Sequence, residues 1–331
     1  MDESIFLRPE YAFLKNNKYL GPNIILLGLG GSHAYGTNIE GSDVDIRGAA
    51  TRSAYDICTG YDFEEVVNNE TDTTIYSFDK MIKLLAECNP NCIEILGLRK
   101  EDYFLMSSVG KQLLLNKNMF LSKNCIHTFG GYATQQLYRL RQKTLDALSP
   151  DEYNKHIVKT IEGMKDHLEN SWHIPAKNIS VVPTSDGLKI SIADLSEVPI
   201  DDFYGMCNEI ANVIRTYNKN SKRNEHAMAH AKVHKHAMHL LRLYMMAIDI
   251  LEKKEIITYR ENEHDLLMAI RNGEFNDSTT GMMTTDFWDL LSEYEAKFNQ
   301  AKETTTLPDK PDESAIKDFQ NDINSWIVIQ G

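Results

Sequence analysis

LLGLGGSHAYGTNIEGSDVDIRG, residues 26–48, is the most informative stretch of this chain, because several glycines and two closely spaced acids follow an apolar run in it. The segment Asn23–Leu27, which is bounded by glycines, is typical of a buried strand. A second strand is expected over Val44–Ile46, with Asp43 and Asp45 on its polar face. Because strand side chains alternate between faces, these two carboxylates are expected about 6–7 Å apart on the same side.

Spacing distinguishes three kinds of phosphate-binding loop in this stretch. A dinucleotide fingerprint requires G-x-G-x-x-G, but His33 occupies the third glycine position after Gly28 and Gly30. A P-loop requires a lysine directly after its last glycine, and no glycine of this stretch is followed by one. The remaining pattern is Gly31-Ser32 followed by an Asp-x-Asp unit at 43–45.

This remaining pattern predicts phosphoryl or nucleotidyl transfer. Two carboxylates on one face repel each other unless a cation lies between them, and Mg²⁺ (or Mn²⁺) prefers oxygen ligands that it shares with substrate phosphates. The backbone at Gly30 and Gly31 and the Ser32 hydroxyl can approach a triphosphate closely.

A third carboxylate is expected from a neighbouring strand, because a second metal ion needs its own anion. We expect a strand over Thr71–Tyr76 and favour Asp72, with Glu70 on the same strand face as the alternative. Asp43, Asp45 and Asp72 are therefore the candidate catalytic and metal-binding residues. For Arg47, which follows the acids, the sequence leaves open a structural or a phosphate-binding role.

Length and composition indicate a folded, soluble protein of roughly two domains. The chain has 331 residues, of which 42% are hydrophobic and 25% charged. Its net charge of −13 excludes a uniformly basic nucleic-acid binder, although a local basic patch is compatible with it. No apolar run reaches the ~18 residues of a membrane span, so we expect no membrane partner. The five cysteines are too sparse for a disulfide framework, which favours the cytoplasm.

The pattern of apolar and polar residues changes near residue 118. Residues 1–118 mix short apolar runs with turns and predict an α+β domain that carries the glycine stretch. Ser77 is expected to cap a helix whose buried face carries Phe78, Met81, Ile82 and Leu85. Residues 119–331 predict a helical domain, interrupted by a β-hairpin near 178–194. The expected helices are 119–145, 151–170, 204–219, 226–253, 261–272, 284–302 and 313–326.

The expected helix from His226 carries basic residues on one side and apolar residues on the other. No acid lies between Lys232 and Arg242, which is unusual for a surface helix in an acidic protein. We therefore expect Lys235, His239 and Arg242 to bind the triphosphate or an anionic acceptor. A zinc site at His226, His230 and His234 is a weaker alternative, since no cysteine or acid nearby completes it.

The motifs together resemble the DNA-polymerase-β-like nucleotidyltransferase superfamily, and within it the bacterial and phage family linked to RNA repair and RNA ligases. The resemblance covers most of the chain. It rests on GGSHAYGT (30–37), SDVDIRG (42–48), DTTIY (72–76), NPNCIE (89–94), GYATQQLYRL (131–140) and KHAMHLLRL (235–243).

The resemblance implies a polymerase-β-like palm, with the metal site, followed by a helical domain. It also implies a nucleoside triphosphate donor, expected to be ATP, two Mg²⁺ ions and release of pyrophosphate. It leaves the acceptor open. We expect an RNA 3′ end, such as that of tRNA, with nucleotidylation (AMPylation) of a protein hydroxyl or a small-molecule acceptor as alternatives. A non-catalytic RNA- or nucleotide-binding module is the alternative from another class.

Overall fold

The computed structural model describes residues 3–145, 173–184, 187–193, 198–221, 230–277 and 283–330, together with a few positions between 158 and 169. The chain divides into two compact units. The first unit contains residues 1–137, 234–275 and 285–331, and the second contains residues 138–233 and 276–284.

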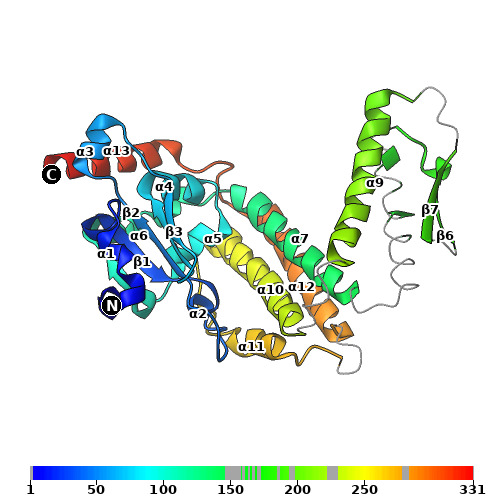
Figure 1. Cartoon of the computed structure of the whole chain (residues 1–331), viewed down its shortest axis with the longest axis horizontal. Coiled ribbons are helices and arrows are strands. Elements are labelled where there is room, and N and C mark those ends of the chain that lie inside the picture. Colours follow the sequence, from blue (N-terminus) through cyan, green and yellow to red (C-terminus); the bar gives the residue numbers. More distant parts are fainter. Residues whose placement is uncertain are drawn as a thin grey trace. The chain divides into compact units, whose positions relative to one another are not determined.

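A five-stranded mixed sheet forms the centre of the first unit (Figure 1). Its strand order is β3-β4-β2-β1-β5, in which the β2–β4 pair is parallel and the other neighbours are antiparallel. The α+β fold class expected from the sequence is thereby confirmed. The strands are β1 (Ile24–Leu29), β2 (Ile46–Ala50), β3 (Glu65–Asn68), β4 (Thr73–Ser77) and β5 (Tyr103–Met106).

Two of the expected strands begin later than the sequence pattern indicates. β2 starts at Ile46, so Asp43 and Asp45 lie in the extended segment before it rather than alternating along it. β4 starts at Thr73, which makes the prediction that Glu70 shares a strand face with Asp72 wrong. The side chain of Asn68 accepts hydrogen bonds from the N–H groups of Glu70 and of Thr71, and these bonds form a turn where a strand was expected.

Short helices surround the sheet. The prediction for α4 (Phe78–Ala86) is confirmed: the Ser77 hydroxyl accepts a hydrogen bond from the Lys80 N–H, and the expected apolar face is buried. The C-terminal helix α13 (Glu313–Gln330) runs beside α4, where the rings of Phe78 and Phe319 lie 6.0 Å apart (Figure 1). The others are α1 (Phe13–Asn16), α2 (Gly31–Tyr35), α3 (Ala54–Thr59), α5 (Pro90–Ile93) and α6 (Ser108–Leu115). Short 3₁₀ turns occupy Glu3–Leu7, Pro9–Tyr11, Gly21–Asn23, Glu94–Gly97, Lys100–Asp102 and Lys117–Phe120.

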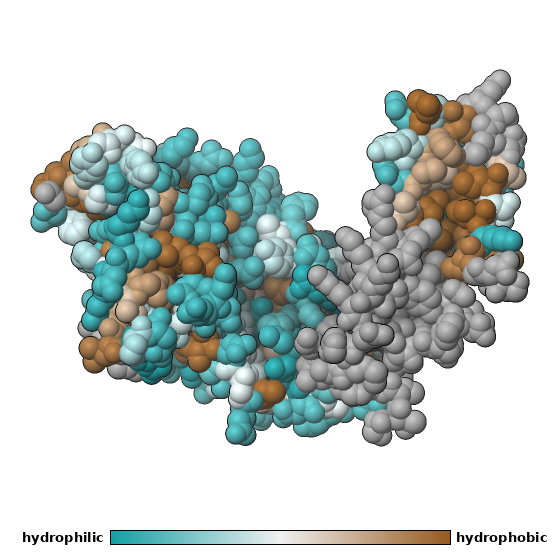
Figure 2. All heavy atoms as spheres, viewed as in Figure 1, coloured by the Kyte–Doolittle hydropathy of each residue, from teal (hydrophilic) through white to brown (hydrophobic). Residues whose placement is uncertain are grey.

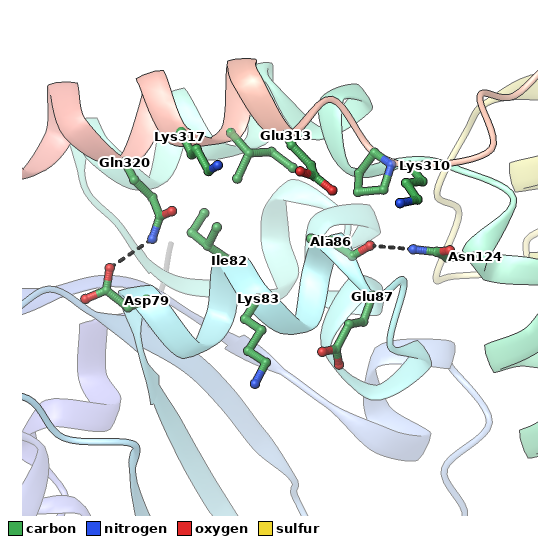
Figure 3. A pocket seen from close by; sticks show the side chains of 12 residues that line it. Asp79, Ile82, Lys83, Ala86, Glu87, Asn124, Lys310, Glu313, Lys317 and Gln320 are labelled. Atoms are coloured by element: carbon green, nitrogen blue, oxygen red, sulfur yellow. Dashed lines mark hydrogen bonds between the residues drawn. The ribbon is translucent and has the colours of Figure 1, made fainter.

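Figure 3 shows how α4 and α13 meet. Gln320 of α13 donates a hydrogen bond to Asp79 of α4 at 2.9 Å, and a groove of about 460 Å³ lies between the two helices. Apolar side chains such as Ile82 and Ile316 line this groove together with charged ones. The helix α13 therefore packs against α4 and is connected to the sheet through it.

Long helices form a layer next to the sheet, with α7 (Asn124–Leu145), α10 (His230–Lys253) and α12 (Thr285–Thr304) side by side (Figure 1). Gln136 of α7 hydrogen-bonds His236 of α10 at 2.8 Å. On the other flank, Tyr244 of α10 donates to Glu295 of α12 at 3.1 Å. The shorter helix α11 (His264–Asn272) follows α10 and returns towards the glycine stretch.

The second unit has its own small core. Strands β6 (Ile179–Thr184) and β7 (Gly187–Ile192) form an antiparallel hairpin in the interval where the sequence suggests one, and α9 (Ile200–Ser221) packs on it. A 3₁₀ turn at Ala176–Asn178 precedes the hairpin. Asp186 and most of the helix expected over 151–170 lie outside the described residues. Figure 2 shows apolar patches over α9 and the hairpin, where exposed apolar side chains are Val182, Ile190, Ile200, Phe203 and Tyr204.

Candidate active site

A polar cavity of about 270 Å³ opens beside the glycine stretch of the first unit. Its wall combines acids that precede β2 and β4 with bases from α10 and α11. The lining residues are Ser32, Ile39, Glu40, Gly41, Ser42, Asp43, Asp45, Asp72, Lys235 and Arg271. The structure therefore brings the three predicted aspartates, Ser32 and Lys235 together at one cavity.

The register of β2 and β4 explains why the acids meet. The two strands are parallel, and Ile46 is paired with Thr73, so the residues just before them enter the sheet side by side. The N–H of Ile46 donates to the carbonyl of Asp72 at 3.1 Å, which fixes Asp72 next to Asp45. Asp72 has a positive φ of 44°, a conformation that Asp tolerates better than most residues.

Arg47 ties the two acidic segments together. Its guanidinium donates to the carbonyl of Asp72 at 2.6 Å and lies 3.3 Å from the carboxylate of Asp45. These contacts give Arg47 a structural role in the site. Its position in the sequence leaves open whether the role is structural or phosphate-binding.

The glycine loop wraps closely around Asp45. The Gly30 N–H donates to the carbonyl of Asp45 at 2.8 Å. Gly31 has a φ of +56°, and a Cβ at this position would collide with the Asp45 carboxylate. The backbone of Gly31 favours the ionised form of the buried Glu94 and so acts to lower the pKa of that carboxyl. The Gly30 N–H thus already has a partner within the protein. Ser32 is the member of the loop that lines the cavity.

Burial and neighbouring charges act on Asp45 in opposite directions. Burial raises the pKa of this half-buried carboxyl, and repulsion from Asp72 and from Asp43 raises it further. The positive charges of Arg47 and Lys235 act against this increase. A cation near Asp45 would relieve the repulsion among the carboxylates.

The basic wall comes from residues distant in sequence. Lys235 is an exposed residue of α10, and Arg271 belongs to α11. Sequence analysis missed Arg271, because an isolated arginine in an amphipathic helix carries no local signal of function. Together the two bases face the acids across the cavity.

Two predicted nucleotide-binding residues lie elsewhere. Neither His239 nor Arg242 lines the cavity. Burial, together with the cations around it, lowers the pKa of His239 well below its usual value. Arg242 is only 7% exposed and is directed at Glu94 and at the ring of Tyr35. It contacts the support of the glycine loop and not the cavity.

The carboxylates do not form a ready-made metal cage. Within the described part of the chain, no three side chains of His, Cys, Asp or Glu are grouped so that they could hold a metal ion. His226, one of the three histidines of the alternative zinc site, lies outside the described residues. Mg²⁺ does not require such a cage, because it commonly binds through one or two carboxylates, water and substrate phosphates. Acids that repel one another beside a polar cavity fit this mode of binding.

In the ranges that the structure describes, no helix is both long enough and apolar enough to cross a bilayer.

Comparison with known proteins identifies the part of the chain that forms the sheet. No curated protein matches the chain, and no solved structure does. Residues 11–157 match the family model described as the RNA repair pathway DNA polymerase beta family. This match contains all five strands of the sheet, the glycine loop and the three aspartates, whereas Lys235 and Arg271 lie beyond it. Over this segment, the chain is similar to the RNA repair pathway DNA polymerase beta family, whose description implies a polymerase-beta-like nucleotidyltransferase.

Proposed function

We propose that this protein is a metal-dependent nucleotidyltransferase that moves a nucleoside monophosphate from a nucleoside triphosphate, such as ATP, to the 3′ hydroxyl of an RNA. The observation that carries the proposal is the composition of one cavity. Asp43, Asp45 and Asp72 line one part of it, Ser32 lies in the glycine loop, and Lys235 and Arg271 supply positive charge.

The carboxylates of Asp43, Asp45 and Asp72 would bind one or two divalent metal ions, Mg²⁺ or Mn²⁺. When bound, the metal neutralises charge on the triphosphate and on the oxygens that react. The match to the family model and the mutual repulsion of the acids support this assignment.

The protein's own groups would bind and orient the substrates. The Ser32 hydroxyl donates to a phosphate oxygen, and Lys235 and Arg271 pair with the triphosphate. Asp72 accepts the proton of the incoming hydroxyl. The hydroxyl oxygen then forms a bond to the α-phosphorus, the bond from this phosphorus to the bridging oxygen breaks, and pyrophosphate leaves with the bonding electrons.

Lys235 provides a test of triphosphate binding. We expect Lys235→Ala to lower kcat/KM for the triphosphate about tenfold, mainly through a higher KM, because an exposed charge-assisted contact is lost. Lys111→Ala is the matched control, since Lys111 is an exposed lysine of α6 that does not line the cavity. Steady-state kinetics at several triphosphate concentrations measures both variants. Equal KM values for the two variants would contradict the assignment.

The acceptor is identified by following the label. The protein is incubated with each α-³²P-labelled nucleoside triphosphate, Mg²⁺ and cellular RNA and protein, and the products are treated separately with nuclease and with protease. The description of the family as part of an RNA repair pathway supports RNA as the acceptor. We therefore expect label that nuclease removes and protease leaves. Label that protease alone removes would assign a protein acceptor instead, and binding of the triphosphate without pyrophosphate release would indicate a non-catalytic module.

A further inference from the structure

Glu94 and Arg242 form a buried ion pair behind the glycine loop. The two side chains are each 8% exposed, and the Arg242 Nη1 lies 3.7 Å from a carboxylate oxygen of Glu94. Neither residue lines the cavity. Because burial of charge is costly unless it is compensated, such a pair requires an explanation.

Glu94 lies behind the first residue of α2. The backbone of Gly31, which has a φ of +56°, favours the ionised form of the Glu94 carboxyl. The backbone of Glu94 is itself anchored, because the Thr258 hydroxyl donates to its carbonyl at 2.6 Å. The next residue after Gly31 is Ser32, the proposed phosphate ligand, so a support of α2 also supports Ser32.

Arg242 holds the other end of the same short helix. Its guanidinium lies 3.5 Å from the centre of the Tyr35 ring, a cation–π contact with the last residue of α2. Tyr35 is 1% exposed. The ion pair therefore contacts α2 at Gly31 through Glu94 and at Tyr35 through Arg242.

We propose that Glu94 is a positioning residue for nucleotide transfer, because with Arg242 it supports α2 from behind so that Ser32 faces the cavity. This proposal rests on the proposed function of that cavity. It also gives a physical reason for two stretches that the catalytic roles leave unexplained, because NPNCIE (89–94) ends in Glu94 and KHAMHLLRL (235–243) contains Arg242. Burial raises the pKa of Glu94 to about 7 against the opposing effect of Arg242, so measurements at pH 8 examine the ionised carboxylate.

Hydrogen–deuterium exchange of the glycine loop tests the proposal without reference to activity. We expect Glu94→Ala to speed exchange of the amides in residues 28–36 about 10- to 100-fold, since Arg242 loses its buried partner and α2 loses this support. Glu94→Gln keeps the size of the side chain and a carbonyl oxygen that can accept from Arg242, and we expect it to restore much of the protection. The matched control is Asp249→Ala, which breaks another buried ion pair of α10, that of Asp249 with Arg260.

Kinetics supplies the second measurement. In Glu94→Ala the affinity for Mg·ATP and kcat/KM fall about 10- to 100-fold, whereas Asp249→Ala lowers the melting temperature but leaves both within about twofold of wild type. If Glu94→Ala does not fold, Arg242→Lys is measured instead. We expect it to speed hydrogen–deuterium exchange of the loop amides. Loop exchange that stays unchanged, or that rises equally in Asp249→Ala, overturns the proposal, as does full activity in a variant with a loosened loop. If the wild type transfers no nucleotide while Glu94→Ala still loosens the loop, the proposed function fails and the structural support of the loop by Glu94 stands.

Discussion

A variant in which Asp43 and Asp45 are both replaced by Asn loses nucleotidyl transfer by a factor of about 1,000 or more, while its melting temperature changes little. Each substitution keeps the size of the side chain and removes the negative charge that would bind the metal. Loss of several kcal/mol of charge stabilisation in the transition state corresponds to a decrease of this size. The measurement is transfer of label from α-³²P-ATP to the RNA acceptor.

Glu70→Gln is the control for this variant. Glu70 is an exposed acid two residues before Asp72 that does not line the cavity. We expect its replacement to leave transfer within about twofold, whereas Asp72→Asn lowers transfer as the double variant does. Undiminished transfer in the Asp43/Asp45 variant would refute the site, and a loss confined to Glu70→Gln would move the third acid to that residue.

The second large effect is expected at Gly31. An added Cβ would meet the Asp45 carboxylate, and an alanine at a φ of +56° is strained in addition. The collision moves Asp45 or the loop by a fraction of an ångström or more, and misplacement on this scale reduces catalysis about 100-fold. We therefore expect Gly31→Ala to lower kcat/KM at least about 100-fold, as measured by initial rates of pyrophosphate release.

Gly60→Ala is the control that separates the effect of the Cβ collision in Gly31→Ala from the effect of backbone strain. Gly60 ends α3 with a φ of +71°, and nothing lies within 4 Å of the position that its Cβ would take. Both variants carry a backbone strain of about 1 kcal/mol, which urea unfolding measures. Gly60→Ala should retain wild-type rates. If both variants lose activity equally, strain and not contact with Asp45 is responsible.

Local patterns predicted the elements whose signals are contained in a few residues. The apolar run that becomes β1 and the capping Ser77 both follow from short-range preferences, and the structure has both of them. The sequence pattern predicts the starts of β2 and β4 too early. At β4 the reason is local, because the Asn68 side chain accepts a hydrogen bond from the Glu70 N–H and favours a turn over a strand there. Alternation of polar and apolar residues does not contain that information.

The parts of the site that depend on tertiary contact could not be read from the sequence. Arg271 of α11 and Glu94 of the 3₁₀ turn Glu94–Gly97 are distant in sequence from the glycine loop, and only tertiary packing brings them close to it. Arg242 shows that the same limit applies to a residue that the sequence did single out. Its basic helix face predicted contact with the triphosphate, yet the side chain is buried against Glu94 and Tyr35. Burial of a charged residue depends on its partners, which its own helix does not reveal.

The first compact unit is assembled from three separate segments of the chain, and this has a consequence for the choice of expression fragments. A truncated protein that stops after residue 157 would span the whole family match and retain every aspartate. It would lack Lys235 and Arg271, so the mouth of its pocket would be electronegative and would repel a polyphosphate. The smallest fragment worth purifying for enzymology therefore extends at least through α11, well past the border that homology alone suggests.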